Sequence, residues 1–189
     1  ALVAGPGLGD DADTVELLQR TFESDSPLLL DADALNLMAA EPELQSALAV
    51  RTGAGATILT PHPLEAARLL DMTVAEVQAD RLGAARQLAT QLGVIVVLKG
   101  SGTVIAAQDG SVVVNNTGGP ALATAGTGDV LSGLCGSLLA QGWLIHIRGC
   151  RATAVGFVEQ VLEGQPVHSC LLTCWRTSHS PANSRPIRP

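Results

Sequence analysis

Short, continuous apolar runs recur along this chain, and three of them lead through a polar or glycine-rich turn into a helix-forming stretch. The runs occupy residues 1–4, 27–30, 56–60 and 94–98. Runs of this length without polar alternation are typical of strands buried on both faces of a sheet. Because parallel strands need crossover connections, usually helices, the pattern predicts an α/β fold with an open, mostly parallel sheet flanked by helices.

Two helices and a hairpin complete this outline. Residues 13–23 place their apolar side chains on one face, which predicts a helix packed against the sheet. Thr73 and Glu76 form a capping-box pattern for a helix that continues to about Leu92 and ends at Gly93. The hairpin is predicted for residues 103–107 and 111–115, across a turn at residues 108–110.

The composition argues against several classes of protein. With 189 residues, of which 47% are apolar and 15% charged, the chain has the make-up of a globular domain. A net charge of −7 and a single lysine, Lys99, argue against nucleic-acid binding. The chain has neither a membrane-span pattern nor a signal-peptide pattern, so we expect a cytoplasmic protein without a membrane partner. Four cysteines without paired CxxC spacing predict reduced thiols.

The chain divides into two parts that differ in composition. Residues 1–142 carry the strand and helix patterns, and we expect them to form one partial domain. Both tryptophans and three of the four cysteines lie in residues 143–189, whose end has no apolar periodicity. We therefore expect an atypical C-terminal segment with a disordered end. Because a domain seldom begins with a central strand, we also expect the N-terminal part of the fold to be absent.

A glycine-rich loop that runs into an apolar helix gives the strongest ligand-binding signal. It occupies residues 115–134, NNTGGPALATAGTGDVLSGL. Gly126 and Gly128 let the backbone bend and present its amides, and the N-terminus of the helix adds unpaired N–H groups and the positive end of its dipole. At this junction, Asp129 is either a base facing a hydroxyl that is about to meet a phosphoryl group, or the N-cap of its own helix.

Two other loops with ligand-type residues follow the first two predicted strands. Gly5, Gly7 and Gly9 form a loop that a ligand could approach closely, although a glycine turn is also a common structural element. Asp31 and Asp33 follow the second strand, at the sheet edge where open α/β folds bind their ligands. Asp33 is alternatively a cap for the next helix, and the two roles are compatible.

The next two strand ends carry an isolated histidine and the lysine. His62 lies between two prolines, which limit the entropy lost when it contacts a ligand, but a lone histidine is often structural. The lysine lies among small residues suited to phosphate or adenosine contacts, or is a solvated lysine in a tight turn. These residues are Lys99, Gly100, Ser101, Gly102 and Thr103, which do not match a P-loop because the lysine precedes the glycines. The loops are predicted to converge on one edge of the sheet.

Five motifs, in this order, resemble those of the ADP/ATP-dependent NAD(P)H-hydrate dehydratases. They are AGPGLG at 4–9, DADALN at 31–36, LTPHPLEAARLL at 59–70, VVLKGSGT at 96–103 and GGPALATAGTGDVLSG at 118–133. The resemblance covers residues 1–142 and implies a ribokinase-like fold, often the C-terminal half of a bifunctional protein with an NAD(P)H-hydrate epimerase. It also implies a repair reaction, in which the C6 hydroxyl of hydrated NADH or NADPH is phosphorylated with ADP or ATP and leaves as phosphate.

The resemblance implies roles for the predicted site residues. These are Asp129 as the catalytic base; Lys99, Gly100, Ser101, Gly102, Thr103, Gly126 and Gly128 for the adenine nucleotide; and Gly5, Gly7, Gly9, His62 and Asp129 for the hydrated dinucleotide. No residue is assigned to a metal, but Mg²⁺ is expected to bridge the nucleotide phosphates, because one lysine supplies little positive charge. An epimerase domain or partner and a homo-oligomer are further expectations.

Two other interpretations stay open at this stage. One is a ribokinase-like small-molecule kinase of the hydroxyethylthiazole or hydroxymethylpyrimidine type, in which a GTGD aspartate also serves as base. The motifs DADALN and PHPLEAARLL favour the dehydratase. The other is a non-catalytic nucleotide-binding fragment, because a sheet without its first strands exposes an apolar edge.

Overall fold

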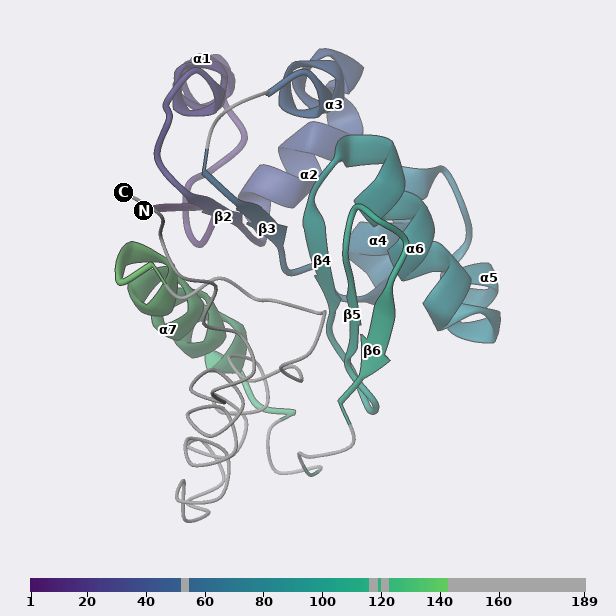
Figure 1. Ribbon diagram of the computed structural model, residues 1–189. Coiled ribbons are helices and arrows are strands. Elements are labelled where there is room, and N and C mark those ends of the chain that lie inside the picture. The colour runs from purple at the N-terminus through teal and green to yellow at the C-terminus, as the bar shows by residue number, and fades with distance from the viewer. Residues whose placement is uncertain (52–54, 116–118, 120–122, 143–189) are drawn as a thin grey trace, which may run out of the picture.

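A six-stranded sheet forms the centre of the molecule (Figure 1). The computed structural model describes residues 1–51, 55–115, 119 and 123–142, so the predicted segment 143–189 and parts of the glycine-rich loop lie outside the described residues. The strands are β1 (Leu2–Ala4), β2 (Leu28–Leu30), β3 (Thr57–Leu59), β4 (Ile95–Leu98), β5 (Val104–Ala106) and β6 (Val112–Val114).

The strands lie side by side in the order in which they occur in the chain. β1 to β4 pair in parallel, and β5 and β6 add an antiparallel hairpin to β4. The predicted open, mostly parallel sheet is therefore confirmed, and so is the hairpin. Right-handed crossovers that always step in the same direction carry their helices to the same face of the sheet.

The helices that connect β1 to β4 follow this rule. They are α1 (Ala12–Phe22), α2 (Asp33–Ala40), α3 (Pro42–Ala49), α4 (Pro63–Leu70), α5 (Val74–Ala79), α6 (Arg81–Leu92) and α7 (Thr127–Ala140). Figure 1 shows α1 to α6 on one side of the sheet and α7 on the other, where α7 packs against β1 and β2. No helix in the described ranges is long and apolar enough to cross a membrane.

Alternate side chains of each buried strand enter two separate cores. Leu28 and Leu30 of β2 join the larger core beneath α1 to α6, whereas Leu29 between them joins the core beneath α7. β4 behaves in the same way, with Val97 in the α7 core. Because successive side chains of a strand point to opposite faces, a strand covered on both sides must be apolar throughout. This accounts for the unbroken apolar runs in the sequence.

The helix predicted for residues 73–92 is two helices, α5 and α6, separated at Asp80. The capping box of Thr73 and Glu76 is present, and Gly93 ends α6 in the left-handed conformation, as predicted. Asp80 is the break: its backbone leaves the helical region, and its carboxylate accepts the Gly83 N–H at 2.8 Å as the N-cap of α6. An Asp that caps a second helix does not interrupt the apolar periodicity, so the sequence pattern predicted one continuous helix in place of α5 and α6.

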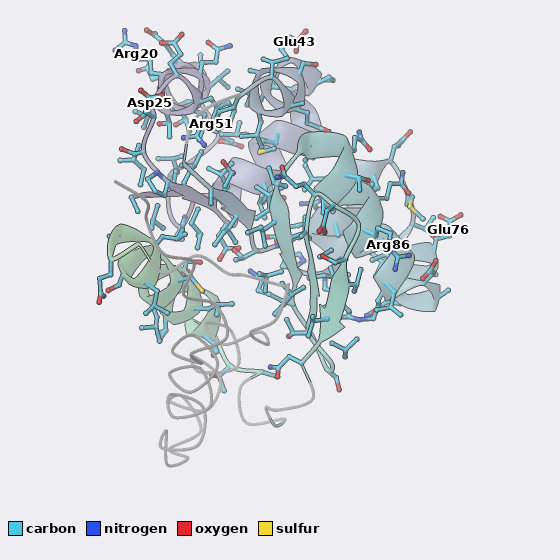
Figure 2. The ribbon with its side chains drawn as sticks, viewed as in Figure 1. Arg20, Asp25, Glu43, Arg51, Glu76 and Arg86 are labelled. Atoms are coloured by element: carbon cyan, nitrogen blue, oxygen red, sulfur yellow. The ribbon has the colours of Figure 1, made fainter. Side chains whose placement is uncertain are left out.

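Arg51 bridges the segment that follows α1 and the segment that enters β3 (Figure 2). Its guanidinium donates to the carbonyl oxygens of Phe22, Ser24, Ser26 and Gly55, and to the hydroxyl of Thr57. Burial lowers the pKa of Arg51, with Asp25 acting in the opposite direction. One side chain therefore satisfies several carbonyl groups where the chain leaves α1 and enters β3.

Gly136 lets α7 approach β1 closely. A β-carbon built on this buried glycine would lie 2.3 Å from Cγ2 of Val3, much closer than van der Waals contact. Gly133, one turn earlier on the same helix, has nothing within 4 Å of the same position. The two glycines thus offer a matched pair for measuring this contact.

We expect Gly136→Ala to be less stable than Gly133→Ala by about 1–3 kcal/mol, because both gain helix propensity but only the first forces an overpacked contact. Free energies of unfolding from urea titrations of the full chain provide the measurement. Adding Val3→Ala should restore most of the loss. Equal stabilities of the two glycine variants would contradict the packing described here.

Candidate functional site

A buried carboxylate, Asp31, lies at the centre of the carboxyl edge of the sheet. It follows β2 directly and is 1% exposed. Its Oδ1 accepts from Lys99 Nζ at 2.6 Å and from its neighbour's N–H, that of Ala32, at 3.0 Å. Its Oδ2 accepts from Ser132 Oγ at 2.6 Å. One side chain therefore joins the ends of β2 and β4 to the first turns of α7.

Lys99 lies between two buried carboxylates. Besides its contact with Asp31, Lys99 has its Nζ 4.0 Å from Oε2 of Glu65. Glu65 is buried, with 4% of its surface exposed. Burial raises the pKa of the Glu65 carboxyl, while hydrogen bonding and charge from His62 and the charge of Lys99 oppose this. Two acids around one ammonium group mean that the charge of Lys99 is largely balanced within the protein.

His62 is the N-cap of α4. Its Nδ1 accepts the N–H groups of Leu64 and Glu65 at 3.1 and 3.2 Å, and Oε2 of Glu65 accepts the His62 N–H at 2.6 Å. The second ring nitrogen, Nε2, is 3.3 Å from Oε1 of Glu65. This is a reciprocal capping box with histidine in place of the usual serine or threonine. The structural role that the sequence left open for His62 is therefore present.

The glycine loop after β1 packs against the end of β2. A β-carbon on Gly5 would lie 1.7 Å from the carbonyl oxygen of Asp31, so the chain can pass here only without a side chain. Gly9 donates its N–H to Oδ2 of Asp33 at 3.0 Å. The predicted helix cap by Asp33 is wrong, because Ala32 is the N-cap of α2 and has no side-chain cap bond. Gly7, with a φ of 66°, has open space around it.

The start of α7 lies beside the lysine and the buried carboxylate. A β-carbon on Gly128 would be 3.7 Å from Lys99 Nζ and 3.8 Å from Oδ2 of Asp31. The N-cap of α7 is Gly126, with a φ of 83°, so Asp129 is not the N-cap. Asp129 instead lies in the first turn, exposed, and its carboxylate makes no hydrogen bond or ion pair with the residues the structure describes.

The loop after β4 is held at both ends. The Lys99 N–H donates to the carbonyl oxygen of Pro61 at 2.8 Å, and Thr103 Oγ1 donates to that of Gly100 at 3.0 Å. Gly100 and Gly102 have φ values of 136° and 65°, which L side chains rarely adopt. Ser101, between them, is exposed.

Some of the predicted site residues lie in one network of contacts, and others do not. The structure links Gly5, His62, Lys99 and Gly128 through contacts with Asp31 and Glu65. The sequence singled out neither Glu65 nor Ser132 and gave Asp31 no specific role. Glu65 could have been found as the third residue after the cap in HPLE. Ser132, inside an apolar helix pattern, carries no such signal.

The described residues form neither a cluster of metal ligands nor a reactive cysteine. They contain no group of three or more histidine, cysteine or acidic side chains that could hold a metal ion. Cys135 of α7 is a free, buried thiol, as predicted, and burial together with the charge of Asp31 raises its pKa to about 12. A thiol with this pKa stays protonated near neutral pH and is a poor nucleophile. The other three cysteines lie outside the described ranges.

Named proteins are similar in sequence to most of this chain. The sequence model of the NAD(P)H-hydrate dehydratase family matches residues 1–167. The ADP-dependent (S)-NAD(P)H-hydrate dehydratase of Neisseria meningitidis is 47% identical over 152 residues, covering 79% of this chain and 50% of that protein. A bifunctional NAD(P)H-hydrate repair enzyme of Escherichia coli is 43% identical over 140 residues, 74% of this chain and 25% of that protein. The chain thus spans half or less of the length of these relatives.

Solved structures agree with this picture. An ADP/ATP-dependent NAD(P)H-hydrate dehydratase from Bacillus subtilis, co-crystallised with ATP and Mg²⁺, is 31% identical, with a TM-score of 0.67 over 92% of this chain and 63% of that one. A ribokinase-like superfamily protein from Enterococcus faecalis is 28% identical, with a TM-score of 0.68 over 86% of this chain and 54% of that one.

The sheet order and the loops at its carboxyl edge define a protein of the ribokinase-like class. Within that class, the family model covers most of the residues and the relatives are more than 40% identical. The chain belongs to the NAD(P)H-hydrate dehydratase family.

We expect Asp31→Asn to lower the free energy of unfolding by about 3 kcal/mol, because it leaves the partly buried Lys99 ammonium without its main counter-charge. Glu16→Gln is the control: it breaks the Arg20–Glu16 pair, which has the same 2.6 Å separation but side chains 72% and 61% exposed. This exposed pair should be worth less than about 1 kcal/mol. Similar losses in the two variants, measured by urea unfolding, would contradict the role of burial.

Glu65 should make stability fall as pH rises. Because its carboxyl has a pKa above the ordinary 4.5, the folded chain holds a proton that the unfolded chain releases first. Between 4.5 and the raised pKa, each step up in pH therefore costs folding free energy. The advantage of Glu65→Gln over the wild type, measured by urea unfolding at several pH values, should grow across this range. Glu43→Gln, at an exposed position of α3 (Figure 2), removes a solvent-exposed carboxylate and is the control.

Proposed function

We propose that this chain carries the nucleotide-dependent dehydration of hydrated NADH and NADPH. The observation that carries the proposal is the position of Gly128: a β-carbon built there would lie in van der Waals contact with Lys99 Nζ and Oδ2 of Asp31, at 3.7 and 3.8 Å, and the exposed Asp129 is the next residue. The N-terminus of α7 therefore lies next to Lys99, the first residue of the loop of residues 99–103. Backbone N–H groups of a helix N-terminus suit a phosphate, and a free carboxylate beside them suits a hydroxyl that will receive it.

Asp129 is the proposed base of the first step. It takes the proton of the C6 hydroxyl as this oxygen attacks the terminal phosphorus of the nucleotide, and the bond from that phosphorus to the rest of the nucleotide breaks. With ADP as donor, AMP leaves. The lone pair of the ring nitrogen then expels phosphate by cleavage of the C6–O bond, and loss of a proton from C5 restores the dihydronicotinamide. Phosphorylation is needed because hydroxide is a much poorer leaving group than phosphate.

The neutralised lysine gives a reason to expect a divalent cation. Lys99 is already paired with Asp31, so it has little charge left for the nucleotide. Mg²⁺ usually binds through phosphates, waters and one or two carboxylates rather than through a cage of protein ligands. When bound, the ion would neutralise charge on the phosphates, and Asp129, the acidic residue in the first turn of α7, is an exposed carboxylate that could contribute a ligand.

The partners follow from the family. Proteins similar to this chain include bifunctional repair enzymes, so we infer that an epimerase domain or a separate epimerase supplies the epimer that this site accepts. Hydrated NADH and NADPH and an adenine nucleotide are the proposed ligands. We place the reaction in the cytoplasm, where these cofactors are used, and propose a homo-oligomer as the working assembly.

The test is recovery of NADH absorbance from purified hydrated NADH, with Mg²⁺ and either ADP or ATP. We expect recovery that requires the nucleotide and falls at least about 100-fold in Asp129→Asn, the scale of losing a general base. Asp13→Asn is the matched control, since Asp13 is an exposed acid in the first turn of α1.

Each other outcome has a clear meaning. Recovery that Asp129→Asn retains would remove Asp129 as base. A stable phosphorylated product without NADH would favour a small-molecule kinase of the same fold. Nucleotide binding with no turnover would identify a non-catalytic fragment, and the proposal would then apply only to longer members of the family.

A further inference from the structure

Arg81, at the start of α6, reaches into the loop that is proposed to hold the nucleotide. Its Nη2 lies within hydrogen-bond distance of three carbonyl oxygens, those of Leu98, Lys99 and Gly102, at 3.1, 3.2 and 3.4 Å. Its Nη1 donates to Oε1 of Gln78 at 3.0 Å. The side chain is partly buried, and no part of it belongs to the loop itself.

Gly100 is the residue that makes room for this guanidinium. A β-carbon at Gly100 would lie 3.0 Å from Nη1 and 3.1 Å from Nη2 of Arg81, and its φ of 136° also disfavours a side chain. The first glycine of the KGSGT motif, Gly100, therefore has a structural explanation in this chain: the loop backbone packs closely around an arginine.

The arginine also orients the peptide groups of the loop. In a trans peptide the C=O of one residue and the N–H of the next point in opposite directions. Because the Lys99 carbonyl points toward Arg81, the Gly100 N–H points away from it, and this N–H donates to no group in the described part of the chain. The loop thus turns its acceptors inward and a donor outward, as an anion-binding loop requires.

Charge gives an independent reason to single out Arg81. Lys99 is balanced by Asp31 and Glu65, whereas Arg81 has no acidic partner within 4.0 Å among the described residues. A guanidinium stays protonated at all relevant pH values, so its charge persists even when partly buried. The uncompensated positive charge of this loop therefore comes from Arg81.

We propose that Arg81 is the positioning residue of the nucleotide site, which fixes the loop of residues 99–103 and supplies its positive potential without touching the ligand. The inference rests on the proposed function, in which this loop holds ADP or ATP. It predicts that replacing Arg81 weakens binding of the nucleotide and leaves the affinity for the hydrated dinucleotide unchanged.

The experiment compares Arg81→Met and Arg81→Lys with Arg86→Met in the full chain. Arg86 is on the same helix, exposed, and donates from Nε to one loop carbonyl, that of Gly110 at 3.0 Å, in the β5–β6 turn (Figure 2). Calorimetric titration with ADP and Mg²⁺ gives the Kd, and steady-state assays give KM for ADP and for hydrated NADH separately. Thermal unfolding without ligand reports whether each variant is folded.

We expect Arg81→Met to weaken ADP binding on the order of tenfold or more, because the loop loses both its fixed geometry and its positive potential, with KM for hydrated NADH unchanged. Arg81→Lys, which keeps the charge but not the fork of donors, should fall between Arg81→Met and the wild type. It also serves as the milder variant if Arg81→Met does not fold. Arg86→Met should bind ADP like the wild type.

The failures of the two proposals are distinguishable. A wild-type chain that binds no adenine nucleotide would overturn the proposed function, and this inference with it. Wild-type binding that the folded Arg81 variants retain would overturn the inference alone. Equal increases in KM for both substrates would do the same, because they would indicate general loosening of the fold.

Discussion

The ion pair of Asp31 and Lys99 holds the carboxyl edge of this sheet together. Removing two charges from water is costly, so such a pair adds little net stability unless its remaining hydrogen bonds are also made. Here they are, because Asp31 also accepts from Ser132 and from the backbone. The main effect of the pair is therefore structural specificity: its contacts form only when β2, the loop after β4 and α7 are in one relative position.

In this arrangement the charged side chains stabilise the fold, and the backbone amides are left for ligand binding in the proposed function. Lys99 pairs with Asp31 and lies near Glu65, and His62 caps α4. For the phosphate of the proposed function, what remains is the N-terminus of α7, the amides of the glycine loops and the guanidinium of Arg81 next to one of them. A site of this kind binds phosphate through fixed dipoles, which need no rearrangement when the ligand arrives.

Local patterns predicted the elements well where one cause acts alone. The strands, the capping box at Thr73 and the stop at Gly93 follow from short-range physics, and the structure has all of them. Local patterns failed where two signals compete. Asp80 sits inside a continuous helical pattern yet breaks it by capping α6, and Asp33 has the sequence of a cap but binds the Gly9 N–H instead.

The sequence by itself determined the class of fold, the edge at which the loops meet and the family, because apolar runs, glycines and ordered motifs carry these directly. Only the tertiary structure decided the partners: that Asp31 holds Lys99, that Glu65 lies buried beside it and that Arg81 fills the loop at Gly100. The physical reason is distance along the chain. Asp31 and Ser132 are 101 residues apart, and no local preference of either residue specifies a contact that exists only after the sheet has formed.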